Sequence, residues 1–170
     1  MKKLFYTVAL LFAASIIFTS SNDASSDRGV VINGVRWATH NVETPGTFAK
    51  NPESAGGSFT WEEAKNACPC GWRLPTREEF ESLGGIIGGR WTTVNGVSGR
   101  IFGTAPNQLF LPAAGIPGNP LRQADDWGHY WGTEYSAGNS WALWFFDRAQ
   151  FVVGVINSSP FKFSVRCVAE

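Results

Sequence analysis

The chain has 170 residues, of which 44% are hydrophobic and 14% aromatic, and its 14 basic side chains balance 14 acidic ones. A near-neutral protein has no strong electrostatic attraction to nucleic acid or to anionic membranes, so neither is expected as a partner. The apolar content is sufficient to bury the core of one domain of common size.

The N-terminus has the three-part pattern of a secretory signal peptide: two lysines, an apolar run and a short polar stretch. The apolar run, Leu4–Phe18, is shorter than the roughly 20 residues that a membrane-spanning helix needs. We therefore predict a signal peptide over residues 1–21, a disordered Ser- and Asp-rich spacer over 22–29 and a single domain over 30–170. The expected location is the periplasm, the cell surface or the medium, with no integral membrane segment after cleavage.

The domain is predicted to open with a β-hairpin. Val30–Ile32 and Val35–Trp37 are strand-forming triplets on either side of Asn33-Gly34. An Asn-Gly pair tolerates the positive φ angles of a two-residue hairpin turn. Residues Glu43–Gly57 contain two prolines and three glycines without periodicity, which predicts a loop.

One repeated signature predicts two helices: a threonine followed three residues later by a glutamate, which is the pattern of a capping box. It occurs at Thr60 and again at Thr76. The first helix is predicted from Trp61 to Cys68. A short strand over Trp72–Leu74 separates it from the second helix, which is predicted to end at Gly84.

After the second helix the chain has strand-forming residues throughout. The predicted strands are Trp91–Val94, Val97–Phe102, Leu109–Leu111, Tyr130–Thr133, Trp141–Phe146 and Gln150–Val155. The continuous apolar run Trp141–Phe146 predicts a central strand buried on both faces. The last segment alternates apolar and polar residues, so Cys167 is predicted to point into the core and Arg166 to share the opposite face.

The chain contains three cysteines, Cys68, Cys70 and Cys167. Export implies an oxidising compartment, so one disulfide and one free thiol are expected. Cys68 lies on the apolar face of the first predicted helix and Cys167 points inward, which makes this pair the preferred bridge. Cys70 is the alternate partner. Either bridge would close a loop of roughly 100 residues, nominally worth about 4 to 5 kcal/mol.

Several sequence blocks, taken in order, resemble the Fibrobacter succinogenes major paralogous domain. The blocks are Ile32–Ala38, Thr60–Pro69, Gly71–Thr76, Leu111–Gly115, Tyr130–Tyr135 and Ser164–Val168. The resemblance implies an α+β fold of the C-type-lectin-like and formylglycine-generating-enzyme-like kind, with two short helices packed on antiparallel sheets. In such folds a cysteine of the first helix bridges to one of the last strand, and Cys68 and Cys167 occupy those places. The family occurs in exported and surface proteins of Bacteroidetes and fibrobacters, and its biochemical role is poorly defined.

The residues that the enzymes and calcium-dependent lectins of these folds require are missing. Formylglycine-generating enzymes need a pair of reactive cysteines near the C-terminus, where this chain has Cys167 alone. Cys68-Pro69-Cys70 lacks a second Cys or His group that would complete a metal site. Ala105-Pro106-Asn107 has alanine where a calcium-binding loop needs a carboxylate. We therefore predict no catalytic residues, no metal and no cofactor.

The aromatic second half of the chain provides the candidate binding residues. Aromatic side chains next to Asn and Gly are typical of recognition surfaces. The candidate ligand-binding residues are Trp127, His129, Tyr130, Trp131, Tyr135 and Asn139. We predict a non-enzymatic binding or adhesion module for a glycan or protein ligand, independent of calcium. The alternatives are an envelope assembly subunit, a degenerate enzyme of the formylglycine-generating type and a hypervariable ligand-binding protein diversified by a retroelement.

Overall fold

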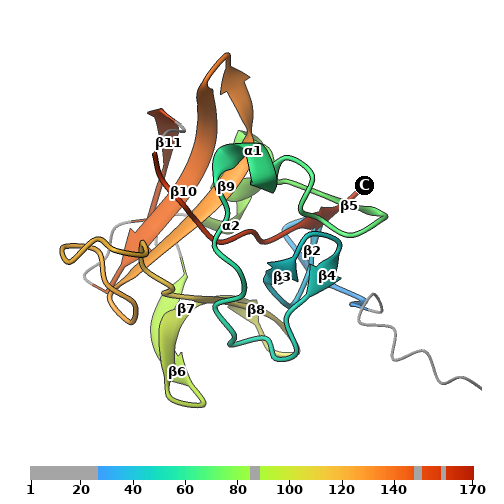
Figure 1. The fold of residues 1–170 in the computed structure, drawn as a ribbon. Coiled ribbons are helices and arrows are strands. Elements are labelled where there is room, and N and C mark those ends of the chain that lie inside the picture. The colour runs from blue at the N-terminus through green and yellow to red at the C-terminus, as the bar shows by residue number, and fades with distance from the viewer. Residues whose placement is uncertain (1–26, 85–88, 148–150, 158–159) are drawn as a thin grey trace, which may run out of the picture.

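A computed structural model of the protein describes residues 27–84, 89–147, 151–157 and 160–170. These residues form mostly antiparallel β-sheets with two short helices, in agreement with the α+β prediction at that level. The predicted signal peptide and most of the predicted spacer lie outside the described residues. Figure 1 shows the long β9–β10 hairpin on one side of the molecule and the sheet that contains β2 and β5 on the other, with the C-terminal segment running between them.

The first hairpin forms as predicted, from β1 (Val30–Ile32) and β2 (Val35–Trp37). Its turn residues have positive φ angles, 49° at Asn33 and 85° at Gly34. The hairpin belongs to a four-stranded sheet of order β1-β2-β12-β5, in which β12 (Val168–Ala169) brings the C-terminus next to β5 (Trp72–Arg73). The sheet therefore joins the two ends of the domain.

The described structure begins at Asp27, within the predicted spacer, and residues 27–29 already contact the segment around β2. The Asp27 carboxylate accepts hydrogen bonds from the backbone of Gly29, Thr39 and His40 and lies 3.0 Å from Nδ1 of His40. Burial opposes ionisation of this carboxyl, but these hydrogen bonds outweigh it and lower its pKa. Asp27 thereby ties the start of the domain to the segment after β2.

Both capping boxes form helices, but the first helix is shorter than predicted. Helix α1 covers Trp61–Ala64, and Thr60 caps it as the sequence indicates. The next turns are tighter, because Ala67 donates its backbone hydrogen bond to the carbonyl of Ala64 and a proline follows soon after. Helix α2 covers Arg77–Gly84 and ends where predicted. Neither helix of the described residues is long and apolar enough to cross a membrane.

The segment predicted as a loop over residues 43–57 contains part of a small hairpin. Strand β3 (Val42–Thr44) pairs with β4 (Thr47–Phe48), and Gly46 occupies the turn with a φ of 81°. The hairpin forms because Val42 and Phe48 are both buried in the core. The two strands are only three and two residues long, which is too short for an alternation of apolar and polar residues to predict them from the sequence.

The second half of the chain forms two three-stranded sheets. One contains β6 (Arg90–Val94), β7 (Val97–Thr104) and β8 (Asn107–Pro112). The other has the order β11-β10-β9, from β9 (Trp127–Ser136), β10 (Asn139–Phe146) and β11 (Phe151–Asn157). As predicted, β10 is central and is covered on both faces. Ala142 contributes to the hydrophobic cluster around α1, and Leu143 contributes to the cluster around α2.

The C-terminal segment joins the core through the preferred disulfide. Cys68 and Cys167 are bonded across a sequence separation of 99 residues, and their Cα atoms lie 6.0 Å apart. Cys70 is a free, exposed cysteine, which excludes it as the partner in this structure. Arg166, which the alternation assigns to the face opposite Cys167, is fully buried, as are its neighbours Val165 and Cys167. Both faces of this short, irregular segment are therefore covered by other parts of the domain.

Candidate functional site

The six residues predicted to bind a ligand do not form one surface. Trp127 and His129 lie near the start of β9, whereas Tyr135 and Asn139 lie at the opposite end of the β9–β10 hairpin. With about 3.3 Å per strand residue, Trp127 and Tyr135 are roughly 26 Å apart along the strand. A ligand of ordinary size could not contact both groups.

The middle pair of these candidate ligand-binding residues, Tyr130 and Trp131, is fully buried, so neither side chain is exposed on the surface of the described structure. The Tyr130 hydroxyl donates to the Pro112 carbonyl at 2.7 Å. The Trp131 indole donates to the Phe59 carbonyl at 2.7 Å, and its ring stacks on Phe163 with centroids 4.2 Å apart. The Tyr130 hydroxyl and the Trp131 indole N–H are therefore both hydrogen-bonded, as is usual for buried Tyr and Trp, and the two side chains contribute to the core.

At the start of β9, an arginine, a tryptophan and a histidine form a cluster. The Arg122 guanidinium lies 5.5 Å from the centre of the Trp127 ring, and the Trp127 and His129 rings are 5.9 Å apart. His129 is buried, and Nη1 of Arg122 lies 3.4 Å from its Nε2. Burial, aided by the positive charge of Arg122, lowers the pKa of His129 to about 3. A histidine whose pKa lies this far below 7 is a weak proton acceptor at neutral pH.

The low pKa of His129 predicts that the protein loses stability in mild acid. Below about pH 6.5 the unfolded chain protonates this histidine, whereas the folded chain does not until about pH 3. Acid therefore favours the unfolded state, and we expect the free energy of unfolding to fall by about 2 kcal/mol between pH 7 and pH 5. Urea denaturation at both pH values measures this effect. A His129→Gln variant, which cannot titrate, should lose most of the difference; an unchanged difference in that variant would contradict the assignment.

The far end of the β9–β10 hairpin carries exposed aromatic surface. Tyr135 is 58% exposed and is the one aromatic residue among the exposed large hydrophobic side chains of the described residues. Its ring meets the Trp141 ring edge-on, with centroids 5.2 Å apart. Asn139 directs its amide to the turn, where it donates to the Ser136 hydroxyl at 3.2 Å. Asn139 thus shapes the turn that connects the strand of Tyr135 to the strand of Trp141.

A buried polar network lies between the sheets, and the sequence analysis missed it. The Arg166 guanidinium donates to Oδ1 of Asn41 at 2.8 Å and to the Ala38 carbonyl at 3.0 Å. The Asn41 amide donates in turn to the Ala55 carbonyl at 2.8 Å. Burial lowers the pKa of Arg166 to about 10, against the opposing effects of Tyr130 and Asp27. The alternation with apolar neighbours predicts only that Arg166 lies on the face opposite Cys167, so nothing in the pattern indicated this buried role.

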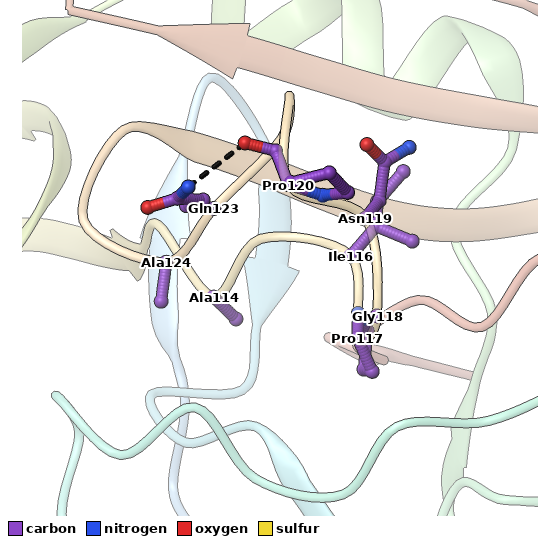
Figure 2. Close-up of a pocket in the computed structure, with 8 residues that line it drawn as sticks. All are labelled: Ala114, Ile116, Pro117, Gly118, Asn119, Pro120, Gln123 and Ala124. Atoms are coloured by element: carbon purple, nitrogen blue, oxygen red, sulfur yellow. Dashed lines mark hydrogen bonds between the residues drawn. The ribbon is translucent and has the colours of Figure 1, made fainter.

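The loop between β8 and β9 contains an open hollow, shown in Figure 2. It has a volume of about 620 Å³ and is lined by Ala114, Ile116, Pro117, Gly118, Asn119, Pro120, Gln123 and Ala124. Hydrogen bonds fix the two arms of the loop: Ile116 donates to Arg122, and the Gln123 amide donates to the Pro120 carbonyl at 2.8 Å. Gly115 permits their close approach, since a Cβ there would lie 2.4 Å from the backbone nitrogen of Ala124.

Neighbouring hollows share lining residues with this one, and together they form what we call the loop-face groove. On one side, residues Ile116–Pro120 line both the first hollow and a second hollow, which is also lined by Pro160, Phe161 and Lys162. Pro160 and Phe161 then line a third hollow, with Thr60, Trp61, Glu62, Gly138 and Asn157. On the other side, Ala114 and Ala124 are shared with a pocket of about 440 Å³ lined by Asn51, Glu53, Ser54, Ala55, Asn95, Val97, Pro112, Ala113 and Asp125.

The two ends of the groove differ in chemistry. The pocket with Glu53 and Asp125 is polar, and a hydrogen bond from Asn95 lowers the pKa of Glu53, so this carboxylate is ionised at neutral pH. The opposite end presents the apolar rings of Trp61 and Phe161. The hollow in the middle is lined mainly by small and apolar residues, among them Ile116 and Pro117, and it also contains the amide side chains of Asn119 and Gln123. This arrangement offers hydrogen bonds and flat apolar contacts in succession along an open path.

Within the described ranges, no three His, Cys, Asp or Glu side chains gather in a way that could hold a metal ion. Comparison of the chain with protein-family models, with curated proteins and with solved structures found no match. The resemblance to the Fibrobacter succinogenes major paralogous domain therefore stays a prediction. The site must be interpreted from its own geometry.

Proposed function

We propose that this protein is an exported, non-enzymatic binding module that holds a glycan along the loop-face groove without calcium. The observation that carries the proposal is the continuity of the groove, in which each hollow shares lining residues with the next. A linear polymer can place successive units in such a path, whereas a small molecule would be better held by one enclosed cavity.

The chemistry of the lining favours a glycan over a protein ligand. Amide and carboxylate groups of Asn51, Asn119, Gln123 and Asp125 can exchange hydrogen bonds with sugar hydroxyls. The four hollows of the groove are open rather than enclosed, whereas an anchoring side chain of a protein partner usually fills a well-packed pocket. The disulfide between Cys68 and Cys167 is typical of proteins from oxidising, extracytoplasmic compartments, which supports export.

Filling the groove tests the proposal. Ala124 is exposed and lines the hollow of Figure 2, so an Ala124→Trp substitution would obstruct the path without disturbing the core. The mature domain is applied to a glycan array in buffer with calcium and in buffer with a chelator. We expect calcium-independent binding in the natural protein and a loss of at least about tenfold in affinity in the variant, which corresponds to about 1.4 kcal/mol.

The matched control is Ala137→Trp. Ala137 is also an exposed alanine, but it lies in the turn after β9 and lines none of the four hollows. Its variant should bind as the natural protein does. Equal losses in both variants, or strict dependence on calcium, would overturn the proposal, and binding to protein but to no glycan would reassign the groove to a protein partner.

A further inference from the structure

Tyr135 lies at a β-bulge near the end of strand β9. In the pairing of β9 with β10, Asn139 is opposite Ser136 and the next residue, Ser140, is opposite Glu134. Tyr135 is therefore the extra residue of β9 and has no partner on β10. A bulge re-aims a side chain relative to the regular alternation of a strand. Here the side chain it leaves exposed is a tyrosine, at 58%.

A second irregularity in the pairing of the same strand lies next to the start of helix α2. Between Ser140 and Ala142 the register shifts again, and Thr133 donates its backbone N–H to the Pro75 carbonyl at 2.9 Å. Pro75 immediately precedes the cap of α2, so this hydrogen bond holds the first turn of the helix against the end of β9. The first residue of that helix is Arg77.

The Trp141 side chain contacts both Arg77 and Tyr135, and we call these three residues the aromatic ledge. The Arg77 guanidinium lies 4.9 Å from the centre of the Trp141 ring, and the Tyr135 ring meets Trp141 edge-on. Nε of Arg77 donates to the Glu81 carboxylate at 2.6 Å, which balances its charge. The ledge therefore combines supported aromatic surface with no unbalanced charge.

We propose that the aromatic ledge is a second binding site, which stacks on a sugar ring of a neutral glycan. A pyranose ring has a face of C–H groups, whose positive edges suit the negative face of an aromatic ring. Its hydroxyl groups lie around the rim and can remain in water. An acidic sugar is not favoured, because the cation at the ledge is already paired with Glu81.

The ledge and the loop-face groove lie on opposite faces of the β9–β10–β11 sheet. Trp141 shares its strand face with Leu143, which packs in the cluster around α2. The groove ends at Trp61, which packs in the cluster around α1 together with Ala142. Binding at the ledge is therefore a separate property, which can hold or fail independently of the function proposed for the groove.

Tyr135 can be tested without disturbing the fold, because a side chain more than half exposed contributes little to core packing. The full mature domain, with tryptophan indoles labelled with ¹⁵N, is titrated separately with cellohexaose, xylohexaose, maltohexaose and a hexamer of galacturonic acid. The Trp141 signal is assigned with a Trp141→Phe variant. We expect at least one neutral hexamer to shift the Trp141 signal and the acidic hexamer to leave it in place.

Two substitutions then separate stacking from other contacts. Tyr135→Phe keeps the ring and should bind within about twofold of the natural protein, whereas Tyr135→Ala should bind roughly five- to tenfold more weakly. The groove variant Ala124→Trp should retain this binding, which distinguishes the two sites. The proposal is overturned if no neutral hexamer moves the Trp141 signal, if the acidic hexamer alone moves it, or if Tyr135→Ala binds as tightly as the natural protein.

Discussion

Removal of the Cys68–Cys167 disulfide is expected to lower the free energy of unfolding by about 2 to 5 kcal/mol. The bond joins residues 99 positions apart, so its loss frees a very long loop in the unfolded chain. It also releases the C-terminal segment, whose residues Phe163 and Val165 are fully buried in the core. The measurement is urea denaturation of a Cys68→Ala/Cys167→Ala double variant, compared with the natural protein under oxidising conditions.

Cys70 supplies the matched control for this experiment. It is an exposed, free cysteine two residues from Cys68, so a Cys70→Ser variant should unfold at the same urea concentration as the natural protein. A reducing agent should destabilise the natural protein and the Cys70→Ser variant alike but leave the double variant unchanged. Equal stability of the double variant and the natural protein would show that packing alone holds the C-terminal segment.

Substitution of Asn41 by leucine is expected to cost about 2 to 4 kcal/mol of stability, although the two side chains have similar shapes. The change removes the acceptor for Nε of Arg166 and leaves a buried positive charge with one fewer partner. It also removes the donor to the Ala55 carbonyl at 2.8 Å, next to the polar end of the loop-face groove. Chemical denaturation at pH 7 measures the loss.

A double-mutant cycle tests whether the stability loss of Asn41→Leu comes from the buried charge of Arg166, which then has one hydrogen-bond partner fewer. Arg166→Met removes the charge and keeps much of the apolar volume. The double variant Asn41→Leu/Arg166→Met should therefore be more stable, by about 1 to 3 kcal/mol, than the sum of the two single losses predicts. Simple additivity would mean that the hydrogen bond between the two side chains contributes nothing to stability.

Elements with strong local signals could be predicted from the sequence. Asn33-Gly34 forms the predicted hairpin turn with positive φ angles, because that conformation depends on the turn residues themselves. The capping boxes at Thr60 and Thr76 start helices for the same reason. The pairing of Cys68 with Cys167 could be preferred because both cysteines belonged to apolar faces of predictable elements.

The candidate site was predicted only in part, because the sequence pattern around an aromatic residue does not show whether its side chain is buried or exposed. Tyr130, Trp131 and Tyr135 belong to one strand, and all three are candidate ligand-binding residues in the sequence. The register of β9 against β10 places the first two in the core, and a bulge leaves the third exposed. Pairing between strands is a property of the whole sheet, so no local pattern could separate them.

The turns, the helix starts, the positions of most strands along the chain and the inward position of Cys167 could be predicted from the sequence, because neighbouring residues set these features. Tertiary structure alone decided the burial of Arg166, the small β3–β4 hairpin, the loop-face groove and the aromatic ledge. Each of these joins segments far apart in the chain, as Arg166 joins Asn41 across 125 residues. Contacts of that range depend on how the sheets pack on one another, and packing is settled only when the whole domain has folded.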